Sequence, residues 1–262
     1  MKNLHGKVAL ITGSTSGIGL AVAHKLASQG TRVVIHGLLA QKDGELICRE
    51  LAEHTGGTAS YHRADLRNPE EISALIGGVS EDAGEIDILI NNAGVQHVSP
   101  IQDFAVECWN DMLAVNLSAP FHTIRLCVPA MKKKGWGRIV NVASISGLRG
   151  RAEKPGYNAT KHGLIGLTKS VALELAGYDI TCNALCPGWA LTPIVQKQIE
   201  SFSKKNGMDF PTATRELVSL RQPSGRLVKV EHLASLVMFL CSDEAAEVRG
   251  AAWTMDGGTT AQ

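Results

Sequence analysis

The chain is 262 residues long, with 44% hydrophobic residues, 19% charged residues and a mean hydropathy near zero (+0.03). This composition excludes disordered, collagen-like and fibrous proteins, and the length suits one large α/β domain. Lysine plus arginine (26) nearly cancel aspartate plus glutamate (25). Net charge therefore gives no support for a nucleic-acid partner or a membrane partner, and the ligand must be inferred from local motifs.

Apolar runs of strand length alternate with helical patterns along the whole chain. The expected strands are residues 8–12, 32–36, 59–62, 86–90, 138–142, 180–186 and 252–255. The expected helices are residues 18–28, 45–54, 69–79, 117–133, 158–175 and 230–241. Several strand runs are continuously apolar, as expected for a parallel sheet that helices cover on both faces. The sequence therefore predicts one doubly wound α/β domain over residues 1–262.

One segment interrupts this alternation between the last two strands. Residues 193–226 are long, polar and lysine-bearing, with helical patches at 194–202 and 212–220. An insertion at this place is either decoration or a lid over a binding site. If it is a lid, we expect it to extend over about residues 190–226.

The turn after the first expected strand is rich in glycine and leads directly into a helix. Glycines let backbone amides approach a pyrophosphate, and a helix N-terminus offers unpaired N–H groups. The spacing Gly-x3-Gly-x-Gly differs from the commonest dinucleotide fingerprint, so a purely structural turn is the alternative. The expected cofactor contacts in this turn are Gly13, Thr15, Ser16, Gly17, Ile18 and Gly19.

The ends of the second and third strands bear on the identity of a nucleotide. Dinucleotide sites often place there an acid for the ribose diol or an arginine for a 2′-phosphate. The segment His36-Gly37-Leu38-Leu39 supplies neither, and the missing arginine favours NAD over NADP. Asp65 and Leu66 are expected to bracket the adenine ring. The alternative for Asp65 is a cap of the helix that begins near residue 69.

The six cysteines are scattered and show no metal-ligand spacing. Cys182 and Cys186 are expected to be buried strand residues, and no metal site is predicted. Free thiols and the absence of a secretory pattern favour a cytoplasmic protein. The apolar run at residues 8–11 is too short to span a membrane.

The most informative spacing joins Ser144, Tyr157 and Lys161. Tyr157 and Lys161 are four residues apart at the start of a helical stretch, so both project from one face. A phenol has a pKa of about 10, and a neighbouring ammonium is expected to lower it toward neutrality. Ser144 is placed to hydrogen-bond the same substrate oxygen. The alternative for the tyrosine and the lysine is an ordinary amphipathic surface.

Together with the glycine turn, Asn91-Asn92-Ala93-Gly94, Asn116 and Pro187-Gly188, this spacing resembles the short-chain dehydrogenase/reductase family over essentially the whole chain. The resemblance implies a Rossmann fold and a nicotinamide cofactor. It implies a catalytic tetrad in which Tyr157 is the acid and base, Ser144 polarises the carbonyl, Lys161 also holds the nicotinamide ribose and Asn116 seats a water for proton relay. Tyr157 and Lys161 would thus touch the cofactor as well. The further cofactor contacts that the resemblance implies are Asn92, Ala93, Gly94, Pro187, Gly188 and Thr192.

The variable segments are similar to those of the bacterial D-3-hydroxybutyrate dehydrogenases, a branch of that family. The similarity lies in segments 94–97, 116–119, 186–189 and 195–199. It implies that Gln96, Lys154 and Gln198 hold the substrate carboxylate beside Ser144 and Tyr157, and that Trp189 forms an apolar wall. Ser146 stands where that branch has a histidine, and it is expected to donate one hydrogen bond to the substrate across a wider gap. Arg149, Arg151 and Glu153 also depart from the pattern of that branch. These departures indicate either a compensating donor or a changed substrate.

The sequence thus predicts an oxidoreductase that uses NAD to interconvert a short 3-hydroxy acid and its oxoacid, in particular (R)-3-hydroxybutyrate and acetoacetate. Another oxoacid, a sugar or a polyol is the alternative substrate class. A nucleotide-sensing module without turnover is less favoured, because it needs no Ser–Tyr–Lys set. By resemblance we expect a homotetramer, with the helices of Leu117 and Asn158 at one interface and residues 250–262 at another.

Overall fold

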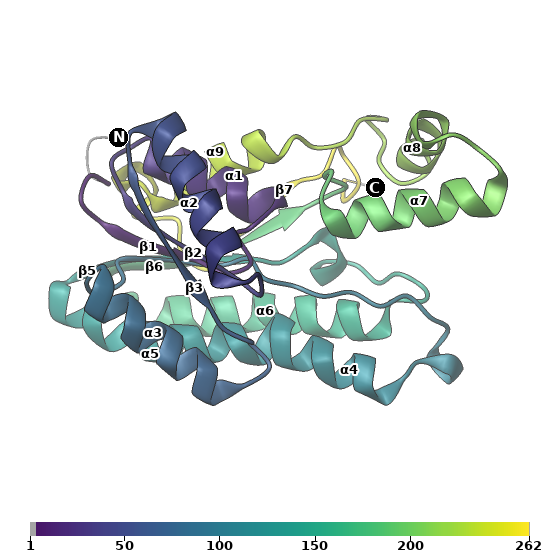
Figure 1. Ribbon diagram of the computed structural model, residues 1–262. Helices are drawn as coiled ribbons and strands as arrows, with labels where there is room; N and C mark the ends of the chain where they lie inside the picture. Colours follow the sequence, from purple (N-terminus) through teal and green to yellow (C-terminus); the bar gives the residue numbers. More distant parts are fainter. Residues whose placement is uncertain (1–3, 262) are drawn as a thin grey trace.

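The computed structural model describes residues 4–261, and over these residues seven parallel strands form one sheet in the order β3-β2-β1-β4-β5-β6-β7 (Figure 1). The strands are β1 (Val8–Ile11), β2 (Arg32–Gly37), β3 (Thr58–Arg63), β4 (Ile88–Asn91), β5 (Trp136–Val142), β6 (Asp179–Pro187) and β7 (Ala252–Met255). The strand order reverses at β1 and β4, the point at which doubly wound sheets bind ligands. The prediction of a doubly wound parallel sheet is confirmed.

Helices cover both faces of this sheet (Figure 1). One face carries α1 (Gly17–Ala27), α2 (Gln41–Thr55) and α9 (Val230–Cys241), and the other carries α3 (Pro69–Asp82), α5 (Ala119–Lys134) and α6 (Pro155–Glu174). All six were predicted, with ends that differ by a few residues. The helix α4 (Val106–Leu113) was not predicted; it is only eight residues long, and Met112 alone among its residues is buried.

The strands read as continuous apolar runs because alternate residues enter two different cores. Ile11 of β1 packs with α1 and α9, whereas its neighbour Leu10 packs with α3 and α5. Both side chains are fully buried. Burying a side chain of this size stabilises the fold by roughly 1.5–3 kcal/mol, so packing on both faces of the sheet holds β1 in place.

The insertion between β6 and α9 folds as two helices, α7 (Pro193–Asn206) and α8 (Phe210–Ser219). The helix α7 contains the predicted patch 194–202, and α8 contains the patch 212–220 except for Leu220. The two helices pack on each other around a small apolar cluster of their own, formed by Trp189, Ile199, Ala213 and Leu217. In Figure 1 they lie at one end of the sheet, apart from the helices that cover its faces.

Within residues 4–261 no helix has the length and apolar character needed to cross a bilayer. Across the same residues, His, Cys, Asp and Glu side chains do not gather in a group of three or more that would suit a metal ion. Cys182 and Cys186 are fully buried in β6, as predicted.

Candidate active site

A cavity of about 1060 Å³ opens where four central strands end. It is lined by Gly13 after β1, Asn92 after β4, Ser144 after β5 and Gly188 after β6. Because the strands are parallel, their carboxyl ends meet at one edge of the sheet, and the loops that follow them converge. The insertion closes one side of the cavity through the first turns of α7 and the segment after α8.

This cavity gathers nearly all the residues that the sequence singled out. Those lining it are Gly13, Thr15, Ser16, Gly17, Ile18, Asp65, Leu66, Asn92, Ala93, Gly94, Gln96, Ser144, Ser146, Lys154, Tyr157, Lys161, Pro187, Gly188, Trp189, Thr192 and Gln198. Gly19 and Asn116 are not among the lining residues and lie behind the cavity wall.

The glycine turn is built by backbone geometry. Gly13 and Gly17 have φ angles of 61° and 58°, in the left-handed region that side chains disfavour. Gly19 also meets a packing requirement. A Cβ at Gly19 would lie 2.5 Å from Nδ2 of Asn92, so glycine lets the first helix pack closely against the turn after β4.

Hydrogen bonds tie the glycine turn to the loop after β4. Thr12 Oγ1 accepts from the backbone N–H groups of Asn92 (3.0 Å) and Ala93 (3.1 Å). The Asn92 amide in turn donates to the carbonyl oxygens of Thr12 and Gly13, both at 2.9 Å. These bonds fix two cavity walls relative to each other.

His36, at the end of β2, is a buried part of this scaffold. Its Nδ1 accepts from Gly13 N–H (3.0 Å), and its Nε2 lies 3.0 Å from the Ala64 carbonyl oxygen, which assigns the proton to Nε2. Burial lowers the pKa of His36 to about 4. The neutral ring therefore clamps the glycine turn, and both of its nitrogens are engaged.

Asp65 does not cap the following helix, so that alternative is wrong. The α3 cap is Asn68, whose Oδ1 accepts from Glu70 N–H (3.0 Å). The Asp65 carboxylate binds the guanidinium of Arg67, with Nη2 at 2.6 Å, and this bond holds the pKa of Asp65 below its ordinary value. Arg67 also lies 3.7 Å from Asp111.

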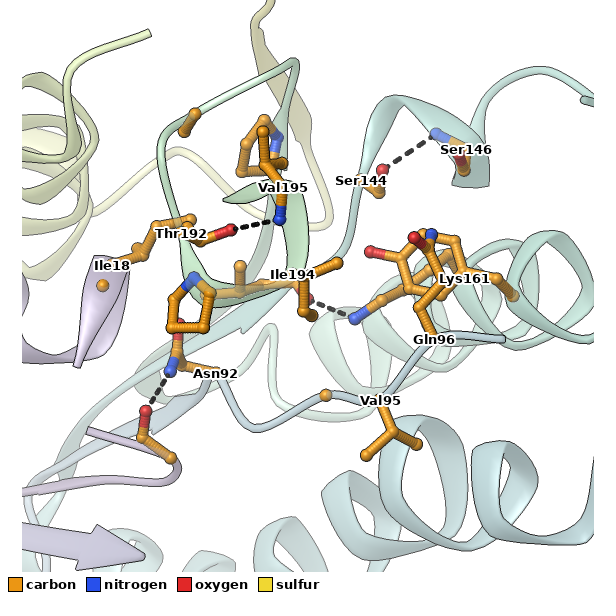
Figure 2. A pocket seen from close by; sticks show the side chains of 18 of the residues that line it. Ile18, Asn92, Val95, Gln96, Ser144, Ser146, Lys161, Thr192, Ile194 and Val195 are labelled. Atoms are coloured by element: carbon orange, nitrogen blue, oxygen red, sulfur yellow. Dashed lines mark hydrogen bonds between the residues drawn. The ribbon is translucent and has the colours of Figure 1, made fainter. Parts of the chain in front are cut away.

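The predicted catalytic side chains meet on one wall of the cavity. Ser144 Oγ accepts from Ser146 N–H at 3.1 Å (Figure 2), which fixes the hydroxyl just beyond the end of β5. Lys161 is buried on α6, and its Nζ donates to the Val142 carbonyl oxygen at 2.8 Å. Burial lowers the pKa of Lys161 to about 8.

The electrostatics of Tyr157 differ from the prediction. Burial raises the pKa of Tyr157 above its ordinary value, and a hydrogen bond with Ser144 offsets part of that rise. The expected lowering by Lys161 is not observed. The ammonium lies 5.6 Å from the centre of the Tyr157 ring and is bonded to a backbone carbonyl instead.

Asn116 lies in a π-helical turn, Ala114–Ser118, between α4 and α5. Its carboxamide is fully buried and pairs with both backbone groups of Val95, accepting at 2.8 Å and donating at 2.9 Å. It also donates to Thr160 Oγ1 at 3.2 Å. Single π turns recur at functional sites, and this one positions the segment that leads to Gln96.

Three side chains from distant segments converge at the other end of the cavity. Lys154 Nζ donates to Oε1 of Gln198 (3.1 Å) and of Gln96 (3.4 Å), and Gln198 Nε2 donates to Gln96 Oε1 (2.9 Å). Lys154 is only 7% exposed, so its charge is buried in the cavity wall and is not a solvated surface charge. Burial, together with Arg151 and Arg221, lowers the pKa of Lys154 to about 8.

The loop before Lys154 is held in an unusual conformation. Glu153 has a φ of 63°, and its carbonyl oxygen accepts from Ser99 N–H at 2.9 Å. Such backbone strain in a residue other than glycine is typical of functional sites. It turns the chain so that Lys154 enters the cavity.

Arg221 and Gln222 are among the cavity residues that the sequence analysis did not single out. They follow α8 in a polar stretch that reads as a solvated loop. Gln222 is buried, and its Oε1 accepts from Trp189 N–H at 2.8 Å. No spacing rule connects them to the site, since they reach it only through the fold of the insertion.

The chain resembles several known proteins. The family model for short chain dehydrogenase matches residues 7–202. The chain is 49% identical to D-beta-hydroxybutyrate dehydrogenase of Cupriavidus necator, over 99% of this chain and 100% of that one. It is 47% identical to the Rhizobium meliloti enzyme of the same name, over 98% and 99%.

Solved structures agree on the fold. L-sorbose reductase of Gluconobacter frateurii, complexed with NADPH and L-sorbose, matches with a TM-score of 0.95 and 33% identity, over 100% of this chain and 99% of that one. An actinorhodin polyketide ketoreductase with NADPH matches with a TM-score of 0.90 and 36% identity, over 97% of each chain. Because the family model covers most of the chain and the relatives match its whole length, the chain belongs to the short-chain dehydrogenase/reductase family of oxidoreductases.

Proposed function

We propose that this oxidoreductase interconverts a short 3-hydroxy acid and its oxoacid with NAD, in particular (R)-3-hydroxybutyrate and acetoacetate. The observation that carries the proposal is the cluster of Lys154, Gln96 and Gln198 in the cavity that also holds Ser144 and Tyr157. The similarity to enzymes named D-beta-hydroxybutyrate dehydrogenase supports the same substrate.

This cluster suits a carboxylate. Lys154 supplies a buried ammonium with three donors, and each glutamine adds an amide N–H group. Bonds from charged donors to carboxylates are among the strong hydrogen bonds of proteins. A short hydroxy acid has little apolar surface, so its recognition depends on such placed donors.

The glycine turn and the first helix fit a dinucleotide. Ser16, the first residue before α1, makes no side-chain cap, so the N–H groups of the first helical turn are free for a pyrophosphate. Gly17 lines the cavity with a φ of 58°, where a side chain would be strained. Asn92, Pro187, Gly188, Thr192 and Lys161 would complete the cofactor contacts.

The bound nicotinamide would accept or supply the hydride. The protein's own part is then proton handling and orientation. The Ser144 hydroxyl donates to the substrate oxygen, and the Tyr157 hydroxyl exchanges a proton with that oxygen. Gln96, Lys154 and Gln198 fix the other end of the substrate and thus aim its carbinol carbon.

The end of β2 favours NAD over NADP. Leu38 and Leu39 line the cavity there, and both nitrogens of His36 are engaged. Among the lining residues of this end, the basic side chain is Arg67, and Asp65 and Asp111 hold it. A 2′-phosphate would therefore lack a cation.

Steady-state kinetics with the two cofactors in parallel test this choice. With 3-hydroxybutyrate as the substrate, we expect kcat/KM for NAD to exceed that for NADP by about tenfold or more. An equal or greater value with NADP would show that the end of β2 accepts the phosphate and would refute the assignment.

Ser146 supports a second candidate, a larger oxoacid, a sugar or a polyol. A serine leaves more room than the histidine of the hydroxybutyrate branch, and the matching L-sorbose reductase was solved with a sugar. The variant Ser146→His separates the candidates. If 3-hydroxybutyrate is the substrate, the variant changes kcat/KM for that acid by less than about tenfold. A gain of more than tenfold, with loss of another parent substrate, would favour the second candidate.

We further propose a cytoplasmic homotetramer that binds neither nucleic acid nor membranes. The six free cysteines are typical of a reducing compartment. Phe121 on α5 and Leu173 on α6 are 47% and 79% exposed, and burying such large apolar side chains against another subunit would stabilise an assembly.

A further inference from the structure

Three arginines line the same cavity and have no part in the mechanism above. Arg149 and Arg151 lie in the loop that leads to α6, and Arg221 follows α8. Two separate segments thus bring guanidinium groups to the substrate end. The structure places them together even though the sequence holds them far apart.

The Arg151 side chain extends over the wall of the substrate site. Its Cζ atom lies 5.9 Å from the centre of the Trp189 ring, within cation–π range. Arg149 is anchored differently, since its Nη1 donates to the Thr259 carbonyl oxygen at 2.7 Å. Over residues 4–261, the guanidinium groups of Arg151 and Arg221 have neither an ion pair nor a side-chain hydrogen bond, so their donors remain available.

The charges at this end are unbalanced. Burial and the repulsion from Arg221 and Arg149 lower the pKa of Arg151 to about 10, and Arg151 and Arg221 also depress the pKa of Lys154. The acids that line the cavity are Asp65 and Asp111, and both contact Arg67 at the nucleotide end. Like charges held together without a counter-ion destabilise the fold, so an anionic ligand is expected to offset them.

A single carboxylate does not account for this arrangement. Lys154, Gln96 and Gln198 already form a complete set of donors for one carboxylate. Arg151 reaches past Trp189, and a guanidinium fork matches a carboxylate through two parallel hydrogen bonds. The guanidinium of Arg151 is therefore available to bind a second anionic group.

We propose that Arg151 and Arg221 form a second anion subsite beside Trp189, and that the enzyme also takes a short 3-hydroxy acid with a second carboxylate at its other end. This inference rests on the proposed function, because it assumes that Lys154 and the two glutamines hold the first carboxylate. The serine at position 146 leaves the added length of such a substrate more room than a histidine would.

The test compares 3-hydroxypentanedioate, its monomethyl ester and 3-hydroxybutyrate as substrates of the full-length enzyme with NAD. The diacid is achiral, and the ester removes the second charge at nearly constant size. We expect kcat/KM for the diacid to exceed that for the ester by about tenfold or more, as for one charge-assisted hydrogen bond. We expect Arg151→Gln and Arg221→Gln each to lower this ratio several-fold, whereas Arg151→Lys retains part of it.

The matched control is Arg215→Gln, an exposed arginine of α8 outside the cavity, which leaves the ratio unchanged. Turnover of 3-hydroxybutyrate with a diacid-to-ester ratio near one overturns the subsite and leaves the proposed function standing. An unchanged diacid-to-ester ratio in Arg151→Gln and Arg221→Gln also overturns the subsite. Failure to turn over any of the three acids overturns both proposals.

Discussion

In the proposed mechanism Tyr157 carries the proton chemistry, in a setting that does not by itself lower its pKa. Burial raises that pKa, and the bond with Ser144 offsets the rise only in part. Replacing Tyr157 with Phe keeps the ring and removes the hydroxyl. We expect kcat to fall by about a hundredfold to ten-thousandfold, with cofactor affinity preserved in a fluorescence titration. A variant with near-normal kcat would exclude Tyr157 as the acid and base.

Lys154 predicts a pH dependence of substrate binding. Its pKa is lowered to about 8, so the ammonium is present below that pH and is lost as the pH rises through 8. Because a carboxylate needs the charged form, kcat/KM for 3-hydroxybutyrate should fall above pH 8. Lys161, whose pKa is also about 8, affects every substrate. The neutral analogue 4-hydroxypentan-2-one is therefore the reference.

The measured quantity is the ratio of kcat/KM for the acid to that for the neutral analogue. We expect this ratio to decline above pH 8 in the parent enzyme and to be small and flat in Lys154→Met. A ratio that stays constant across pH 8 in the parent would contradict the assignment of Lys154 to the carboxylate.

His36 predicts a pH dependence of stability. Its folded pKa is about 4, below the unfolded value of 6.5, so the unfolded state binds the proton more readily. The stabilisation is fully present above pH 6.5 and is lost as the pH falls through 6.5 toward 4. The shift corresponds to about 3 kcal/mol. Urea unfolding of His36→Asn should show a weaker loss over this range than the parent. His54→Asn, an exposed change on α2, is the matched control and should behave as the parent does.

Site residues that are joined by local spacing could be predicted from the sequence alone, whereas those that distant segments bring together could not. Ser144, Tyr157 and Lys161 were predictable because strand and helix fix their relative positions. Lys154, Gln96 and Gln198 were identified through resemblance, since three separate segments bring them together. The raised pKa of Tyr157 was not predictable, because it depends on burial. Arg221 had no sequence signal, since its place depends on how the insertion folds.

The central strands β1 and β4 were predictable because both faces of the sheet are buried there, so these strands read as apolar runs. The helix α4 was missed because it is only eight residues long. The insertion was recognised as helical, but its role as a cavity wall was not decidable from composition. In the structure, α7 and α8 pack around a cluster separate from the main core, so they are expected to open without unfolding the rest.

Ile199, fully buried in that cluster, tests the independence of the insertion. Ile199→Ala removes packing worth about 2–5 kcal/mol. We expect KM for 3-hydroxybutyrate to rise several-fold and limited proteolysis to cut within residues 193–219, while the main thermal transition shifts little. Ser201→Ala, an exposed change on α7, should match the parent. A large fall in Tm without a change in KM would mean that the insertion is part of the main core.

The whole molecule presents exposed apolar side chains on α5 and α6, which favours the proposed tetramer. Phe121→Arg places a charge in that surface, and we expect it to yield smaller species by light scattering coupled to size-exclusion chromatography. Phe210→Arg on α8 is the control and should leave the assembly unchanged. A parent protein that is monomeric at micromolar concentration would refute the proposal. Gln262, the last residue of the tail expected at a second interface, lies outside the described residues.

The central claim is that a carboxylate held by Gln96, Lys154 and Gln198 presents a carbinol to Ser144 and Tyr157. Its most direct test is the rate of nicotinamide reduction with 3-hydroxybutyrate and with 4-hydroxypentan-2-one, which has a neutral acetyl group in place of the carboxylate. We predict that kcat/KM for the acid exceeds that for the neutral alcohol by about a hundredfold or more. Equal values for the two compounds would contradict the claim.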